Sequence, residues 1–269
     1  KILDVMEEMQ LIKKLEILKI EPSSRDIDAP THNFRSLSLF PRNGPEDLLK
    51  SDFDLIRPNI VDGPYQNVEH YLDIQFRLLR EDFMESLRRG VREYRRMSRT
   101  SPNRFKYDGM RLYPRTKFVR SQTTVSHQLG FVVNFSSNFG GKIDWKNSKR
   151  LMVGSLLLFT RNDFDTFFHA TVLERDEKLL QTGRLVVKLT DSNVTVDRRF
   201  FSLDFLMAEP EAFFAPYFSV MRRLQTLDAN NFPMAEYIVH CAPNNVKPKY
   251  VKAASSKWHV LGHEIDLQD

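Results

Sequence analysis

Hydrophobic and polar positions alternate with helical periodicity over one long stretch, Gln66–Met97. No proline interrupts it, and its one glycine, Gly90, costs a helix interior only about 1 kcal/mol. The pattern predicts one continuous helix, roughly 45 Å long at 1.5 Å per residue. The face that recurs at three- and four-residue steps comprises Val68, Tyr71, Leu72, Gln75, Leu79, Phe83, Leu87 and Val91.

After Met110 the pattern changes to short β-rich runs separated by turns such as Asn138–Gly141 and Gln181–Gly183. Runs of this length and spacing predict a small antiparallel barrel or sandwich. The expected strands are Thr116–Val119, Gly130–Phe135, Leu151–Phe159, Phe167–Leu173, Arg184–Leu189, Val194–Val196 and Phe200–Leu203.

The two flanks are mainly helical. Ile2–Leu18 predicts an amphipathic helix, the polar stretch Glu21–Thr31 a linker, and Phe34–Phe40 a short extended segment that docks on another surface. Beyond Glu209 and Pro210 the pattern returns to helix, which we expect Pro216 to break or kink. Residues Glu236–His240 predict one more strand.

The expected fold class is therefore α+β, with a long stalk helix and flanking helices around a small antiparallel β-barrel. We divide the chain into an N-terminal helix and linker (1–64), a basic stalk helix (65–109), the barrel (110–206) and return helices (207–269).

Composition narrows the classes of protein that fit. The longest apolar run, Leu151–Phe159, falls short of the roughly 20 residues that a membrane-spanning helix needs. The N-terminal stretch mixes Lys and Glu with its apolar residues, unlike a signal peptide. Cys241 is the single cysteine, so neither an internal disulfide nor a multi-cysteine zinc site is expected. From composition we therefore expect a soluble, intracellular protein.

Positive charge is concentrated in one segment. The formal net charge is +5, yet Ser86–Arg120 holds twelve basic residues against Glu93 and Asp108. Arginine, which outnumbers lysine there, suits phosphates and stacking on bases, so we expect a surface that binds a nucleic acid or another acidic partner. The alternative is a solvated helix face and loop. Arg88, Arg92, Arg95 and Arg99 recur at three- and four-residue steps. The candidate RNA-binding residues are Arg88, Arg92, Arg95, Arg96, Arg99, Arg111, Arg115, Lys117 and Arg120.

A second candidate surface mixes aromatic and basic residues around one turn: Phe139, Lys142, Trp145 and Lys146. Exposed aromatic rings stack on single-stranded bases, so the turn is a candidate contact for single-stranded nucleic acid; alternatively, Phe139 and Trp145 cap the barrel core. The same turn contains Gly140-Gly141-Lys142 but not the glycine and Ser or Thr that complete a phosphate-binding loop.

Catalytic and metal-binding patterns are not found in the sequence. His259 and His263 are four residues apart, but their surroundings do not look helical and no further ligands accompany them. We expect no metal site and no catalytic residues in this region, since no nucleophile–base pair can be assigned.

The stretch His70–Phe83, HYLDIQFRLLREDF, resembles the segment that precedes the motor in NFX-type zinc-finger helicases, which are large Upf-type superfamily 1 RNA helicases. Weaker similarities follow the same order along the chain. They are Phe34–Pro41, Leu55–Ile60, Gly154–Leu156, Phe167–Val172 and Met207–Phe214.

The resemblance implies a stalk helix leading into a barrel of the accessory type called 1B, with an ATP-dependent motor in the parent protein. ATP, magnesium and structural zinc would bind to the parent, and no cofactor is expected in this region. RNA, single-stranded and read without sequence preference, is the implied partner. RNA surveillance, small-RNA silencing and its inheritance, and antiviral defence are the associated roles. The resemblance also implies a cytoplasmic location, with the perinuclear region or RNA granules as narrower alternatives.

Two functional hypotheses remain open. In the first, the stalk and barrel form an accessory region of an RNA helicase and bind the RNA backbone. In the second, residues 1–41 dock a protein partner or mediate self-association, and the arginines are solvated or paired to acidic protein.

Overall fold

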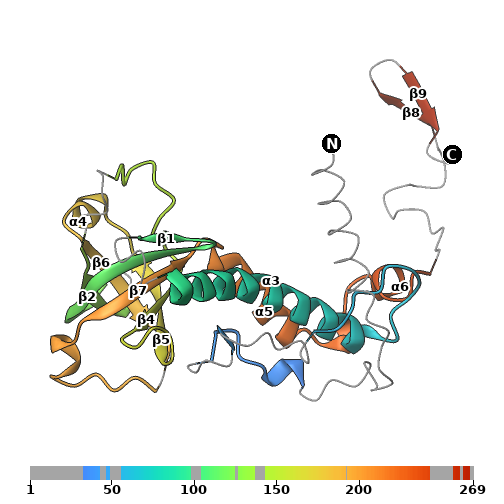
Figure 1. Ribbon diagram of the computed structural model, residues 1–269. Coiled ribbons are helices and arrows are strands. Elements are labelled where there is room, and N and C mark those ends of the chain that lie inside the picture. Colours follow the sequence, from blue (N-terminus) through green and yellow to red (C-terminus); the bar gives the residue numbers. More distant parts are fainter. Residues whose placement is uncertain are drawn as a thin grey trace, which may run out of the picture. The chain divides into compact units, whose positions relative to one another are not determined.

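The computed structural model describes residues 33–42, 47–48, 56–97, 104–124, 127–136, 143–191, 193–242, 257–260 and 263–266 (Figure 1). The chain forms two compact units. The first combines residues up to Asn59 with Leu72–Leu227, and the second combines Ile60–Tyr71 with the chain from Asp228 onward. The predicted helix Ile2–Leu18 lies outside the described residues.

The predicted long helix is confirmed as α3, Val68–Met97. Its apolar stripe is buried as the periodicity requires, with Leu72, Phe83, Leu87 and Val91 all at most 1% exposed. Gly90 sits inside this helix for a packing reason. A Cβ on Gly90 would lie 2.5 Å from Met110 Cβ and 3.0 Å from the Asp108 carbonyl oxygen, so the bare glycine lets a strand turn approach the helix backbone.

A closed six-stranded antiparallel barrel follows α3. The order is β2-β3-β6-β5-β4-β7, closed by pairing of β7 with β2, and β1 adds one strand beside β2. The strands are β1 Lys106–Tyr107, β2 Met110–Thr123, β3 Leu129–Asn134, β4 Leu156–Thr160, β5 Phe167–Glu174, β6 Arg184–Leu189 and β7 Phe205–Pro210. The α+β prediction and the barrel are thus confirmed.

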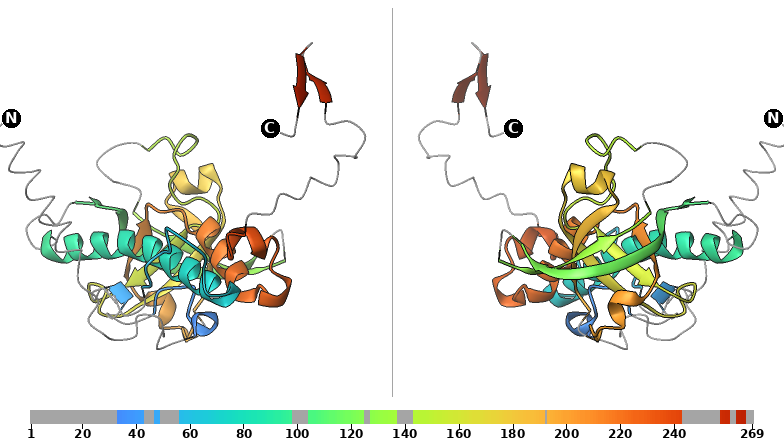
Figure 2. Two further views of the ribbon diagram at one scale, coloured as in Figure 1. Left: turned by 90° about the vertical axis from the view of Figure 1, so that its right-hand side faces the viewer. Right: turned by 90° about the vertical axis from the view of Figure 1, so that its left-hand side faces the viewer.

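Closure depends on β2, which Figure 2 shows as one long curved strand. Its first half pairs with β7 and its second half with β3, with register shifts between Tyr113 and Thr116 and between Phe118 and Arg120. Such irregularities bend a strand, which lets one strand belong to both sides of a barrel. The interior is filled by aromatic rings around Phe118, which lies 4.7 to 6.2 Å from five other phenylalanine rings.

Several strand predictions were wrong in detail. Phe200–Ser202 is a 3-10 helix, and Val194–Val196 forms no strand. Val194 packs against the barrel core as a loop residue, while Thr195 and Val196 are exposed. The strand expected from Leu151 begins at Leu156, after a turn. The strand β7 was missed, and the expected barrel boundary at residue 206 falls inside it. A short helix, α4 (Glu177–Gln181), connects β5 to β6.

The return helix is α5, Phe214–Thr226, which packs along α3 (Figure 1) through rings of Phe83, Phe214 and Tyr217. Pro216 does not break it, because it occupies the first turn, where a proline removes no helical hydrogen bond. The predicted docking segment begins with a 3-10 turn, η1 (Phe34–Ser36). It docks within the chain: Phe34 packs on Phe76, and Phe40 lies between His169 and the rings of α5.

The second unit contains η4 (Ala229–Asn231), α6 (Ala235–Ile238), and a hairpin of β8 (Lys257–Val260) and β9 (His263–Asp266). Tyr65 donates its backbone N–H to the Val239 carbonyl at 2.8 Å. The strand expected at Glu236–His240 is therefore wrong, since helix α6 occupies most of it. His259 and His263 lie in the strands β8 and β9, as their non-helical surroundings indicated.

Candidate nucleic-acid interface

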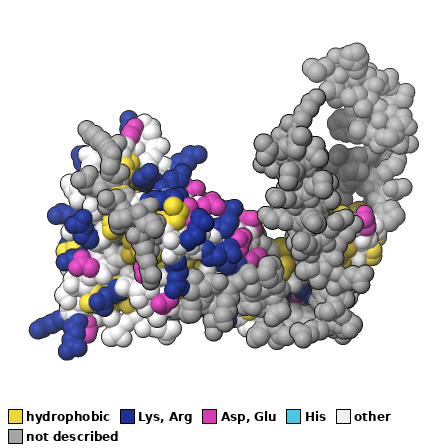
Figure 3. Space-filling view, in the orientation of Figure 1, with side chains coloured by type: hydrophobic (Ala, Val, Ile, Leu, Met, Phe, Trp, Pro, Cys, Tyr) yellow, Lys and Arg dark blue, Asp and Glu magenta, His cyan; other side chains and the backbone are white. Residues whose placement is uncertain are grey.

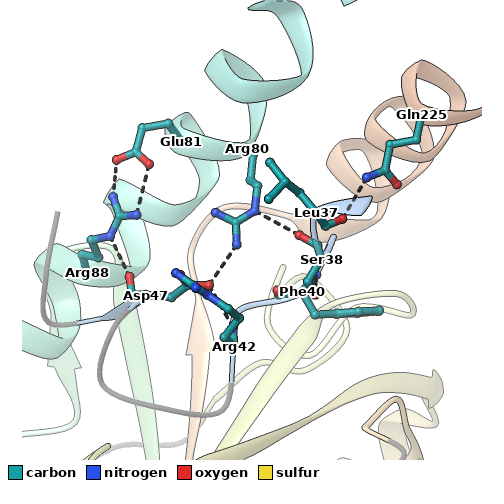
Figure 4. Close-up of polar contacts among 9 residues, drawn as sticks. All are labelled: Leu37, Ser38, Phe40, Arg42, Asp47, Arg80, Glu81, Arg88 and Gln225. Carbon is teal, nitrogen blue, oxygen red and sulfur yellow. Dashed lines mark hydrogen bonds and ion pairs between the residues drawn. The ribbon is translucent and has the colours of Figure 1, made fainter. Parts of the chain in front are cut away.

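Arg88, the first candidate on the stalk, is buried and corrects the expectation of an exposed arginine face. It is 1% exposed. Its Nε donates to the Asp47 carbonyl oxygen at 2.7 Å, and its guanidinium forms a two-bond ion pair with Glu81 (Figure 4). A guanidinium enclosed and satisfied in this way has no surface to offer a phosphate, so Arg88 is a structural residue.

The other stalk arginines are exposed, but most are paired. Arg92 contacts Glu85 at 2.6 Å, and Arg95 contacts Asp165 at 2.9 Å. Arg96 is exposed and has no ion pair within the described part of the chain, while Arg99 lies outside the described residues. Much of the stalk's positive charge is therefore neutralised by carboxylates of the same chain.

Asp47 contacts three arginines, Arg42, Arg80 and Arg88, and so forms the centre of a charged cluster (Figure 4). Its carboxylate accepts from Arg42 at 2.6 Å and from Arg80 at 2.9 Å. Burial raises the pKa of Asp47, but the hydrogen bonds from Arg42 and the charge of Arg80 outweigh burial and hold the pKa below its usual value. Because Arg80 also donates to the Ser38 carbonyl, the cluster fastens the N-terminal segment to α3.

Several contacts join the stalk to the barrel, among them the Asp108 backbone N–H, which donates to Glu93 at 2.6 Å. Tyr94 donates its hydroxyl to Asp163 at 2.6 Å, and Arg95 pairs with Asp165 in the same β4–β5 turn. Burial and the Asp163 carboxylate raise the pKa of Tyr94, so it stays a donor at neutral pH. The close approach of Met110 to Gly90 holds the start of β2 against the helix.

The barrel strand β2 carries exposed cations that are less well paired. Arg115, Lys117 and Arg120 are all exposed, and Arg120 forms no ion pair with the described residues. Lys117 lies 3.5 Å from the exposed Asp204, a separation typical of weak, solvent-screened pairs. Arg111 is a different case, because it is largely covered and bonded to Glu211 at 2.8 Å.

The aromatic turn resolves into two parts. Trp145 is 4% exposed and belongs to the barrel core with Phe135, so for this ring the core-capping alternative holds and the stacking one is wrong. Lys146 is exposed beside it. Phe139 and Lys142 lie outside the described residues.

Sequence reasoning missed residues beside the β2 cations. Asn134 on β3 pairs in register with Lys117 on one side and with Arg184 of β6 on the other. Arg115, Lys117 and Asn134 line an open groove of about 600 Å³ together with the ring of Phe201. The alternation of strand Arg184–Leu189 could have placed Arg184 on the outer face, but only the register places it beside Asn134.

Lys and Arg side chains gather over the barrel and the adjoining end of α3, with Asp and Glu among them (Figure 3). In the described part of the chain, no helix has the length and apolar character needed to cross a membrane. The same residues bring no three His, Cys, Asp or Glu side chains together as a metal site.

Fold and surface together define a β-barrel module carried on a long helix, with a cation-bearing outer face. Residues 105–211, essentially the barrel, match the family model described as the ZNFX1 domain. The chain therefore carries a ZNFX1 domain, and the expected resemblance to NFX-type zinc-finger helicases is confirmed.

Relatives cover most of the chain. It is 30% identical over 234 residues to NFX1-type zinc finger-containing protein 1 of Homo sapiens. The aligned region covers 86% of this chain and 12% of that protein. It is 32% identical over 225 residues to the Helicase required for RNAi-mediated heterochromatin assembly 1 of Schizosaccharomyces pombe, across 82% of this chain and 21% of that protein. The chain thus corresponds to a small part of much longer relatives.

Proposed function

We propose that this region is the stalk-and-barrel accessory module of an RNA helicase and that the outer face of its barrel binds the RNA backbone. The observation that carries the proposal is the cluster of exposed cations on β2: Arg115, Lys117 and Arg120. The similarity to a relative named as a helicase supports the proposal that this module is part of a helicase. ATP, magnesium and zinc would act elsewhere in the parent protein.

The proposal divides the work between the two elements. The stalk arginines are largely occupied by carboxylates: Glu81 and Glu85 pair with them within α3, and Asp165 pairs with Arg95 from the barrel. Of these pairs only Arg95–Asp165 joins the helix to the barrel, and all of them leave the arginines less available to RNA. Phosphate contacts then belong mainly to the barrel, with Arg96 as an exposed contributor from the stalk. Contacts to phosphate carry no sequence information, so binding should be insensitive to sequence.

Salt-dependent binding of a fluorescent single-stranded RNA tests the proposal. Each phosphate contact to a single strand contributes roughly 0.7 to the slope of log affinity against log salt. Replacing Lys117 and Arg120 together with Gln should lower both the affinity and this slope, by roughly 1.4 if both side chains contact phosphate. Arg92→Gln is the matched control, because its cation is already paired to Glu85. Loss of affinity in the control but not in the double variant would refute the assignment to the barrel.

Self-association or protein docking through residues 1–41 is the competing proposal. Its apolar segment Phe34–Phe40 is satisfied within the chain, since Gln225 donates to the Phe34 and Leu37 carbonyls at 2.8 Å and Phe34 is buried. Because Phe34–Phe40 docks within the chain, the partner in this alternative would bind to the helix expected at Ile2–Leu18. Mass measured by light scattering over a concentration series, with and without residues 1–32, distinguishes it.

A further inference from the structure

Three outward-facing residues form a row across neighbouring strands of the barrel. Asn134 is paired in register with Lys117 and with Arg184. Directly paired residues lie on the same face of a sheet. That face is the outer one, because the next residues along the strands, Phe118, Val133 and Leu185, lie in the barrel core. At the usual spacing between strands, the two outer Cα atoms are about 10 Å apart, with the amide between them.

The amide in the middle of this row lacks a partner. Asn134 Oδ1 is buried and accepts no hydrogen bond, and among the described residues it is the one buried side-chain polar atom in that condition. A buried acceptor left unsatisfied is costly, and such groups point to a strained or ligand-binding role. Asn134 itself is only partly buried and lines the groove, and its terminal torsion has a broad range, so the amide can turn toward a bound donor.

The side chains around Asn134 indicate which kind of ligand would carry that donor. Lys117 and Arg115 provide positive charge at the groove, and the partly exposed Phe201 ring adds an aromatic surface. Arg184 is exposed on the far side of the amide and has no ion pair with the described residues. A ligand that fits this order has an anion, then a hydrogen-bond donor, then a second anion. The backbone of RNA has that order, because a ribose with its 2′-hydroxyl lies between successive phosphates.

We propose that the Lys117–Asn134–Arg184 row is a ribose-reading subsite. Phosphates lie at Lys117 and Arg184, and the 2′-hydroxyl between them donates to Asn134 Oδ1. This inference rests on the proposed RNA binding and adds to it a preference for RNA over DNA, since DNA lacks the hydroxyl that satisfies the amide. The base attached to that ribose can stack on Phe201 without regard to its identity.

The test compares two homopolymers of about 12 nucleotides, oligouridylate and oligodeoxyuridylate, which differ only at the 2′ position and lie within the usual range of site sizes. Anisotropy titrations at one salt concentration should give a preference of about five- to ten-fold for the ribose form, the contribution of one neutral hydrogen bond. Asn134→Leu, similar in shape but unable to accept, should reduce that preference to less than two-fold. Asn193→Leu, on the rim of a different groove, should retain it.

The outcomes distinguish failure of the ribose-reading subsite from failure of the proposed function. Equal binding of both homopolymers by the unsubstituted protein, or a preference that survives Asn134→Leu, overturns the ribose-reading subsite but leaves RNA-backbone binding standing. Absence of binding to either homopolymer at low salt refutes the proposed function and the subsite together. A 2′-O-methyl oligouridylate, which cannot donate, should bind like the deoxy form.

Discussion

Substituting Gly90 with Ala isolates the contact between stalk and barrel. An added Cβ would lie 2.5 Å from Met110 Cβ and 3.0 Å from the Asp108 carbonyl oxygen. Neither atom can rotate away, because both are fixed to the backbone of the β1–β2 turn. That turn is itself held by pairing of Met110 with Tyr107 and with Pro210. The helix or the strand must therefore move.

Two effects of opposite sign decide the result. Alanine is favoured over glycine in a helix interior by about 1 kcal/mol. Overpacking a tight contact costs about 1–3 kcal/mol, and a clash with backbone-fixed atoms belongs in the upper part of that range. The net expectation is a loss of about 1–2 kcal/mol in the free energy of unfolding, or roughly 2–6 °C in Tm for a chain of this size.

Urea unfolding followed by circular dichroism measures the change. Arg96→Ala, an exposed position on the same helix, should stay within about 0.5 kcal/mol of the unsubstituted protein. Gly109→Ala tests the same interface from the other side, because its φ is +72° and its Cβ would meet the Ser86 carbonyl at 2.8 Å. If Gly90→Ala instead stabilises the protein by about the helix-propensity difference, the close approach of β2 to α3 is wrong.

Two further predictions concern buried charge. Asp73 pairs with the buried Arg57 at 2.7 Å and with the buried Arg77 at 2.6 Å, so Asp73→Ala should lower the free energy of unfolding by about 3–5 kcal/mol. Asp165→Ala breaks an exposed pair with Arg95 and should cost less than about 1 kcal/mol. Equal effects in chemical unfolding would refute the assignment of the Asp73 pairs as buried. Burial raises the pKa of Glu209, against the hydrogen bonds from Tyr113 and Leu151, so folding favours the neutral carboxyl relative to the unfolded chain. This group's contribution to stability is complete below its ordinary pKa of 4.5 and is lost as pH rises through the raised pKa of the folded state. The free energy of unfolding of the unsubstituted protein should therefore fall relative to that of Glu209→Gln as pH rises above 4.5, and a difference that is flat with pH would contradict the raised pKa.

The sequence predicted elements where one local pattern was sufficient. The helix Val68–Met97 follows from an uninterrupted apolar stripe, and the barrel follows from short runs between turns. The closing strand β7 could not be found this way. Five of its six residues are buried, so it lacks the alternation of a half-exposed strand, and it contains a buried Glu209 that satisfies Tyr113 and Leu151. Those partners lie 96 and 58 residues away.

The same limit applies to the candidate site. Counting charges along Ser86–Arg120 included Glu93 and Asp108, but Arg88 and Arg95 are neutralised by Glu81 before that segment and by Asp165 well beyond it. A run of arginines therefore does not define a binding surface until its partners are known. Asn134 and Arg184 illustrate the reverse case, because local alternation can at most place Arg184 on the outer face, and only strand register brings the two residues together.

Strand β2 joins the two halves of the proposed function. Its first residue, Met110, abuts Gly90 of the stalk, and its middle carries Arg115, Lys117 and Arg120 on the outer face. On the proposed function, RNA held at these cations is connected to α3 through one hydrogen-bonded strand, whereas exposed ion pairs such as Arg95 with Asp165 break and re-form at little cost. The tight glycine contact is therefore the element that would make barrel and stalk move as one body. In the proposed helicase, Gly90→Ala should therefore alter the coupling between RNA binding and the proposed ATP hydrolysis more than Asp165→Ala does. Equal effects of the two substitutions on RNA-stimulated ATP hydrolysis would show that β2 is not the connection.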